Sequence, residues 1–181
     1  MGGALQRSAA TSAGAAGRGA AAAYAYRTGD ADTLRELGLD YNELRANPNV
    51  FDVANRIAQA VCEDLPAGVI EADELLIVVG DLAGWVLETG TEDDPPQPEE
   101  IAREALSKIL AAAYLTETAA KFNGAGLSRQ ERVAAEDEIK AACEELAAQA
   151  DLSAAGPTSQ EFTSAIEQSL SYLRTIYEGD L

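Results

Sequence analysis

Apolar side chains recur at three- and four-residue spacing along most of this 181-residue chain, and this period constrains the fold more than any other feature. Val53, Ile57 and Val61 share one stripe behind a potential helix cap at Asn49. The apolar run 75–79 could by itself be a buried strand, but its acidic start and the apolar positions after it favour a helix. The core is expected to be thin and rich in alanine, leucine and isoleucine, because the chain has only three Phe and one Trp. We therefore predict an all-α protein, a multi-helix bundle with a small-residue-rich N-terminal helix or arm.

Capping residues, glycines and prolines divide this pattern into separate helices. The predicted helical stretches are 29–38, 39–47, 49–65, 69–90, 98–122, 128–150 and 158–179. Capping boxes pair Ser128 with Glu131 and Thr158 with Glu161. The acidic, proline-rich stretch 91–98 is the clearest loop, since consecutive prolines cannot continue a helix or a central strand. The three helices after this loop are predicted to form an antiparallel bundle with short connections.

The first segment, 4–27, consists largely of alanine, glycine and serine and could be a helix or a loosely ordered arm. Glycine destabilises a helix interior by about 1 kcal/mol relative to alanine, and this segment contains Gly14, Gly17 and Gly19. Small residues at three- and four-residue spacing would let a second backbone approach closely. We expect two parts, an Ala/Gly-rich N-terminal arm or helix at 1–28 and a helical domain at 29–181.

The acidic balance limits the classes of partner. The chain has 31 acidic and 13 basic residues and a formal net charge of −18, which repels nucleic acid and anionic lipid and attracts basic partners. The acidic residues could be solvated helix faces or a specific docking surface. No secretory signal is visible, and the first segment is a poor membrane span because small residues dominate it and it contains Arg18. We expect a cytoplasmic protein with two free thiols, Cys62 and Cys143, whose spacing gives no framework for a disulfide.

The residue inventory argues against catalysis. A chain without histidine has no Ser–His–Asp triad, no Cys–His pair and no imidazole ligand for a metal. Two cysteines are too few for a structural zinc site, and the glycines at 14–19 lack the Gly-Lys-Ser/Thr end of a phosphate-binding loop. Paired carboxylates are plentiful but fall mostly at helix ends, and weak cation binding at Glu92–Asp94 stays open. We predict a protein that is not an enzyme and that needs no metal or cofactor.

A few side chains are candidates for contact with a partner. Trp85 is the only tryptophan and lies on an apolar stripe near a helix end, where it could pack in the core or anchor an interface. Tyr24 and Tyr26 end the small-residue segment, which could dock through their rings, and Arg18 lies near its middle. The predicted partner interface therefore consists of Arg18, Tyr24, Tyr26 and Trp85.

Three stretches in sequence order carry a family resemblance: SAATSAGAAGRGAAAAYAYRTG, then LRELGLDYNEL, then VFDVANRIAQAVCEDLPAGVIEADE. With the helices placed as above, residues 8–125 resemble the B component (QatB) of the four-gene Qat anti-phage defence system. The resemblance implies an accessory protein whose partners are a QueC-like enzyme, similar to the queuosine-pathway nitrile synthase, an ATPase and a TatD-like nuclease. It also implies that the QueC-like enzyme could modify the N-terminus, with Gly2 as the candidate position.

Three hypotheses about function follow. The first is a non-catalytic adaptor that binds the QueC-like enzyme in an anti-phage defence complex. The second is a protein substrate that this enzyme modifies. The third is a homo-oligomer, a self-assembling helical protein in which the Ala/Gly face of the first segment pairs with a second copy. Direct binding of nucleic acid or of a membrane is not expected.

Overall fold

The computed structural model describes residues 2–63, 72–91, 94–153 and 158–177, with side chains at all of these positions except 2–10 and 159. Over these residues it contains eight helices and no strand, which confirms the prediction of an all-α multi-helix protein. The helices are α1 (Gly2–Thr28), α2 (Ala31–Glu36), α3 (Tyr41–Arg45), α4 (Val50–Cys62), α5 (Ala72–Glu88), α6 (Pro98–Gly124), α7 (Arg129–Gln149) and α8 (Ser159–Tyr177). The run 75–79 lies inside α5, as the helical interpretation predicted.

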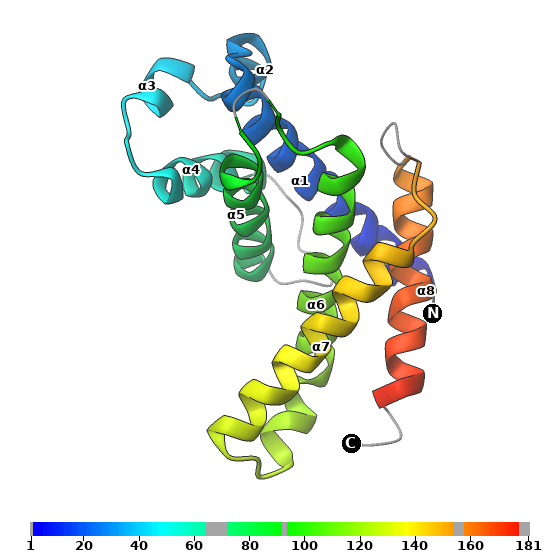
Figure 1. Ribbon diagram of the computed structural model, residues 1–181. Coiled ribbons are helices and arrows are strands. Elements are labelled where there is room, and N and C mark those ends of the chain that lie inside the picture. The colour runs from blue at the N-terminus through cyan, green and yellow to red at the C-terminus, as the bar shows by residue number, and fades with distance from the viewer. Residues whose placement is uncertain (1, 64–71, 92–93, 154–157, 178–181) are drawn as a thin grey trace.

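Helix α1 is a packing centre of the protein (Figure 1). It contacts α2, α4, α5, α6 and α8, so helices from both halves of the chain meet on it. Its buried positions are mostly alanine and include Ala15, Ala16, Ala20, Ala22, Ala23 and Ala25. Side chains this small allow several helices to lie close to one axis. The first segment is thus a helix packed into the protein, and the division of the chain at residue 28 stays a prediction.

Helix α1 approaches α5 closely at Gly19. A Cβ atom on Gly19 would overlap the side chain of Val79, so this crossing requires glycine. Helix α5 also packs against α4, where Gly84 lies opposite Ala54. The close backbone approach that the small residues predicted therefore occurs within the chain.

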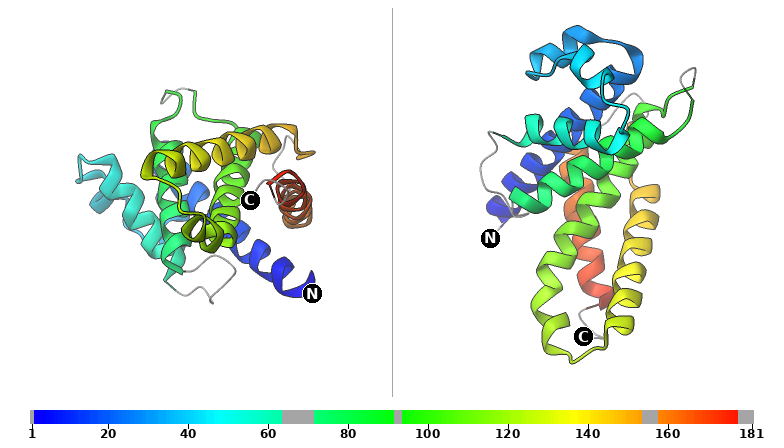
Figure 2. Two further views of the ribbon diagram at one scale, coloured as in Figure 1. Left: turned by 90° about the horizontal axis from the view of Figure 1, so that it is seen from below. Right: turned by 90° about the vertical axis from the view of Figure 1, so that its left-hand side faces the viewer.

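The last three helices form an antiparallel bundle, in which α7 runs opposite to α6 and α8 (Figures 1 and 2). The turn between α6 and α7 ends at Ser128, whose side chain accepts a hydrogen bond from the backbone N–H of Glu131 at 3.3 Å. The Glu131 carboxylate accepts one in return from the backbone N–H of Ser128 at 2.9 Å. Thr158 and Glu161 form the same reciprocal pair before α8. Both predicted capping boxes are confirmed, and they set where α7 and α8 begin.

Helices α5 and α7 have no basic residue in their last turn. An arginine from a neighbouring helix binds the carboxyl end of each. Arg27 of α1 donates to the carbonyl oxygens of Val86, Thr89 and Thr91, at the end of α5 and the start of the loop at 91–98. Arg103 of α6 does the same for α7, with its Nη1 atom 2.7 Å from the carbonyl oxygen of Ala147. Such contacts satisfy carbonyl groups that a helix end leaves without a partner. They also tie α1 to α5 and α6 to α7.

The loop at 91–98 is only partly described. Thr91 and Asp94 exchange two backbone hydrogen bonds of 3.1 and 3.2 Å, which close a tight turn. Pro98 is the first residue of α6, as expected. Glu92 and Asp93 lie outside the described residues, and so does most of the cation site considered at Glu92–Asp94.

A candidate docking groove along the first helix

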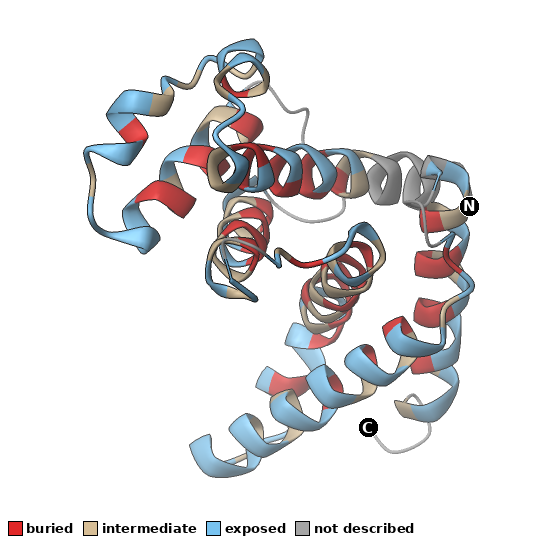
Figure 3. Cartoon of the chain, turned by 45° about the horizontal axis from the view of Figure 1, so that its top comes forward, coloured by how far each residue is buried: buried red, intermediate tan, exposed pale blue. Residues whose placement is uncertain are grey.

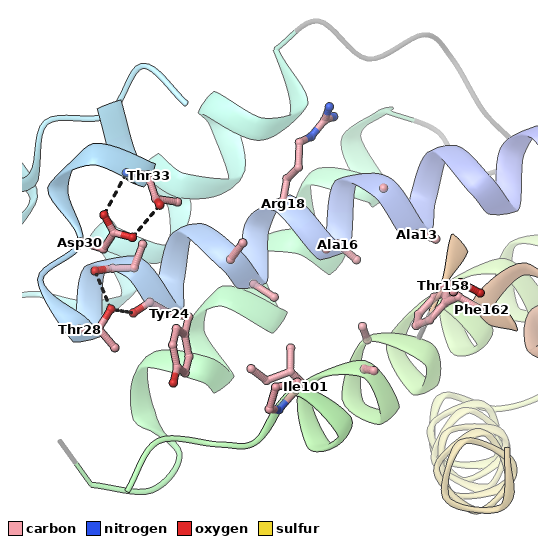
Figure 4. Close-up of a pocket in the computed structure, with 18 residues that line it drawn as sticks. Ala13, Ala16, Arg18, Tyr24, Thr28, Asp30, Thr33, Ile101, Thr158 and Phe162 are labelled. Atoms are coloured by element: carbon pink, nitrogen blue, oxygen red, sulfur yellow. Dashed lines mark hydrogen bonds between the residues drawn. The ribbon is translucent and has the colours of Figure 1, made fainter. Parts of the chain in front are cut away.

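An open groove with a volume of about 720 Å³ runs along one side of α1 (Figure 4). Its floor is α1, where Gly14, Gly17 and Ala21 present almost no side chain. One wall comes from the start of α6 and includes Ile101, and Phe162 of α8 closes one end. We call this surface the α1 groove. It is mostly apolar, because glycine, alanine, isoleucine and phenylalanine contribute most of its lining.

The groove exists because one stripe of α1 is left uncovered. Gly14, Gly17, Ala21 and Tyr24 are exposed and follow one another at three- and four-residue spacing, so they lie on one face. The positions between them are mostly buried, and Figure 3 shows buried and exposed positions alternating along the described part of α1. The neighbouring helices therefore cover most of α1 but leave this face open.

The α6 wall repeats the same spacing. Pro98, Ile101, Ala102 and Ala105 line the groove and form one stripe at the start of that helix. The start of α6 is held in place by Glu100, whose carboxylate accepts a hydrogen bond from the backbone N–H of Gln97 at 2.7 Å. This wall is therefore fixed by local capping as well as by its contact with α1.

One carboxylate lines an end of the groove, and a second is hydrogen-bonded to a residue that lines the other end. At one end, Asp30 accepts hydrogen bonds from the hydroxyl of Thr33 at 2.7 Å and from its backbone N–H at 3.1 Å. These bonds hold the pKa of Asp30 below its usual value. At the other end, Thr158 lines the groove and donates to Glu161, which lies outside the lining. Hydrogen bonds from Ser153 and Thr158 lower the pKa of Glu161 as well. Both groups are negatively charged at neutral pH, so one acid belongs to the lining at the Thr28 end and another lies next to the lining residue Thr158.

Two of the four predicted interface residues line the α1 groove, and they point in different directions. Tyr24 is 38% exposed and points toward the side where Ile101 lies (Figure 4). Arg18 also lines the groove, but its guanidinium turns to the opposite side of α1, where it donates to the carbonyl oxygen of Val61 at 3.4 Å. The charge of Arg18 is thus directed at the end of α4.

The other predicted residues lie elsewhere. The ring of Tyr26 is tilted against that of Tyr41, with centroids 5.9 Å apart, and it lines a different cavity. Trp85 is half-buried and packs against the core from α5. Gly2 begins α1, in the stretch whose side chains are not described. The structure therefore brings Arg18 and Tyr24 to one surface and does not bring Tyr26 or Trp85 there.

Sequence reasoning missed the walls of the groove. Ile101 and Phe162 are 61 positions apart in the chain, and only the packing of α6 and α8 on α1 brings them to the same surface. The sequence feature that could have indicated the α6 wall is the spacing of apolar residues at the start of that helix. That spacing predicts an apolar face but does not say whether another helix covers it.

Neither thiol has the features of a reactive centre. Burial, with a smaller contribution from the nearby Glu144, raises the pKa of Cys143 to about 12. Burial also raises the pKa of the half-buried Cys62, although the charge of Arg18 partly offsets this effect. A thiol acts as a nucleophile mainly as the thiolate, so both shifts oppose reactivity. Both cysteines are free, as predicted.

Among the residues that the structure describes, no group of three or more Cys, Asp or Glu side chains is arranged to hold a metal ion. None of the described helices combines the length and the apolar character needed to cross a bilayer. Comparisons of the chain with protein-family models, with curated proteins and with solved structures found no match.

Proposed function

We propose that this chain is a non-catalytic adaptor of an anti-phage defence complex and that it binds a QueC-like enzyme through the α1 groove. The observation that carries the proposal is the open apolar groove, which includes Arg18 and Tyr24 from the interface predicted by sequence. The resemblance to the B component of the Qat system supplies the identity of the partner. The ATPase and the TatD-like nuclease of that system are further partners in the proposal, and the cytoplasm is the proposed compartment.

The shape and composition of the groove suit protein binding. Exposed contiguous apolar surface usually marks a contact site, because leaving it in water has a free-energy cost. Exposed side chains beside the groove, such as that of Tyr24, can be buried by a partner and contribute to affinity. The described lining of the groove contains one carboxylate, that of Asp30, and no thiol, which suits binding better than catalysis.

Co-purification with the QueC-like enzyme tests the proposal. The two proteins are mixed at micromolar concentration and separated by size exclusion, and we expect them to co-elute. Ala21→Glu places a charged side chain on the exposed floor of the groove and should abolish co-elution. Ala141→Glu, at an exposed alanine of α7 outside the groove, adds the same charge and should leave co-elution unchanged. Separate elution of the two wild-type proteins would refute the adaptor function.

A second candidate function is supported by the position of the amino-terminal end. The start of α1 lies at the outer edge of the molecule in both views of Figure 2, where an enzyme could reach it. In this alternative the chain is a protein substrate of the QueC-like enzyme, with Gly2 as the candidate position. Intact-mass measurement after co-expression with that enzyme tests it: an added mass on the N-terminal peptide is expected, and an unchanged mass rejects it.

A further inference from the structure

We infer that the α1 groove binds one amphipathic helix of the partner, with its apolar side chains in the groove and basic residues near both ends. This inference rests on the proposed adaptor function and specifies the part of the partner that is recognised. Three observations carry it: the backbone of the groove floor, the length of the floor, and the charges at its ends.

The floor of the groove excludes strand-like recognition. An extended peptide that adds to a sheet needs unpaired backbone N–H and C=O groups on its receptor. Here the floor is the middle of α1, whose backbone groups are already paired within the helix. Proline-rich peptides dock on surfaces lined with several aromatic rings, and among the described residues of this lining Tyr24 and Phe162 are the two aromatic ones. A helix that inserts apolar side chains is the remaining common mode.

The length of the floor matches a short helix. From Ala13 to Thr28 the lining spans 16 residues of α1, and the 15 steps between them correspond to about 22 Å or four helical turns. Because Gly14, Gly17 and Ala21 have little or no side chain, a second helix can approach the axis of α1 closely. Larger apolar side chains of that helix would then lie against Ile101 and Phe162.

The charges select a basic helix. Asp30 lies beside the Thr28 end of the floor, and Thr158, which donates to Glu161, lies beside Ala13 at the other end (Figure 4). Arg18 is the only basic residue among the described lining, and its guanidinium is directed at Val61 on the far side of α1. Lysine or arginine residues about four turns apart on the bound helix would face these acids. A second copy of this chain is disfavoured, because each copy carries a net charge of −18.

A designed peptide tests the inference independently of the QueC-like enzyme. The probe is a fluorescein-labelled amphipathic helix of about five turns with a leucine and alanine face and two lysines near each end. We expect saturable binding by fluorescence anisotropy at 0.15 M salt, and no binding of the same peptide with glutamate in place of lysine. Ala21→Glu should weaken binding at least about tenfold, although its added negative charge would strengthen a purely electrostatic attraction. Unchanged or stronger binding by Ala21→Glu would overturn the inference.

Two double variants that remove the same amount of charge separate the effect of the acids near the groove on probe binding from the effect of the overall net charge. Asp30→Asn with Glu161→Gln should weaken binding of the probe by about three- to tenfold. Asparagine and glutamine keep one side-chain oxygen that can accept the capping bond from the backbone N–H, so the starts of α2 and α8 should be retained although each residue loses its charge and its second acceptor oxygen. The control pair, Asp137→Asn with Glu145→Gln, neutralises two exposed acids of α7 and should change binding less than about twofold. Equal effects of the two pairs would overturn the inference, since they would show attraction to the net charge alone.

The outcomes also distinguish this inference from the proposed function. If the QueC-like enzyme co-elutes but neither Ala21→Glu nor the acid pair affects the complex, the adaptor function stands and the groove inference fails. If the probe binds as expected but the enzyme does not co-elute, the proposed partner is wrong. Light scattering adds a third outcome: a dimer that Ala21→Glu dissociates would assign the groove to a second copy and overturn the inference.

Discussion

Gly19 of α1 lies so close to α5 that a Cβ atom on it would be 2.5 Å from Cγ1 of Val79. Real side-chain contacts do not reach such a distance, so the crossing of these two helices depends on a missing side chain. The two other central glycines of α1, Gly14 and Gly17, have no atom within 4 Å of an added Cβ. Three glycines that look equivalent in the sequence therefore differ in what they contribute.

This difference gives the first prediction. Gly19→Ala should lower the free energy of unfolding by about 1–3 kcal/mol, because the new methyl group overpacks the seam with Val79. Gly14→Ala should raise it by up to about 1 kcal/mol, because alanine favours the helix and meets nothing there. Urea denaturation measures both values. Because Val79 is itself buried, the double variant Gly19→Ala with Val79→Ala should lose less stability than the sum of the two single losses, and strictly additive effects would contradict the packing explanation.

The second prediction concerns Arg27, which binds three carbonyl groups at the end of α5. Arg27→Gln should destabilise the fold by about 1–3 kcal/mol, because partly buried carbonyls lose their donors. Arg27→Lys should restore only part of this, since a single ammonium group cannot reproduce the guanidinium fork. Thermal unfolding followed by circular dichroism measures the effect. The control is Arg35→Gln, an exposed arginine paired with Asp32, for which we expect a change within about 0.5 kcal/mol.

The third prediction is a pH dependence at the capping box of α7. Hydrogen bonds from the Ser128 hydroxyl and backbone lower the pKa of Glu131 from its usual value of 4.5. A carboxylate with a lowered pKa in the folded state stabilises the fold above pH 4.5, and this stabilisation is lost as pH falls through the folded-state pKa. Glu131→Gln should therefore destabilise the protein at pH 7.

The same substitution should have a smaller effect near pH 3, because the glutamate is then largely protonated in the unfolded chain and its stabilisation is lost as pH falls through the folded-state pKa. Urea denaturation of wild type and variant at both values measures the difference. Comparing the two proteins at each pH removes the general effect of the net charge of −18. A destabilisation that is equal at both pH values would contradict the assignment to the charged carboxylate.

The fourth prediction separates the two cysteines. Cys143 is fully buried with a pKa near 12, so it should not react with a thiol-specific disulfide reagent in the folded protein at pH 8. Cys62 is half-buried and should react, but more slowly than an unfolded chain. Absorbance should show one slow thiol in the native state and two in denaturant. Modification of both thiols at equal rates without denaturant would contradict the burial of Cys143.

The limits of the helices could be predicted from the sequence because short-range interactions set them. Asn49 caps α4, and Pro98 begins α6, where the sequence indicated. Each of these signals acts within about one turn, so its effect does not depend on the rest of the fold. The same holds for Ser128 and its capping box.

The candidate site could not be predicted in this way. Tyr24 and Tyr26 are two positions apart, yet one ring borders the α1 groove and the other packs near Tyr41, because residues at that spacing point in different directions from a helix. Ile101 and Phe162 reach the groove only through the packing of α6 and α8 on α1.

By itself the sequence determined the helical class, the positions where helices begin, the net charge of −18 and the absence of histidine. The tertiary structure alone decided which face of α1 is covered, which arginine caps which helix, and where an apolar groove stays open. The physical reason is that the two kinds of interaction act over different separations along the chain. Capping and periodicity act between neighbours in the chain, whereas the exposure of a face depends on contacts between residues far apart in sequence.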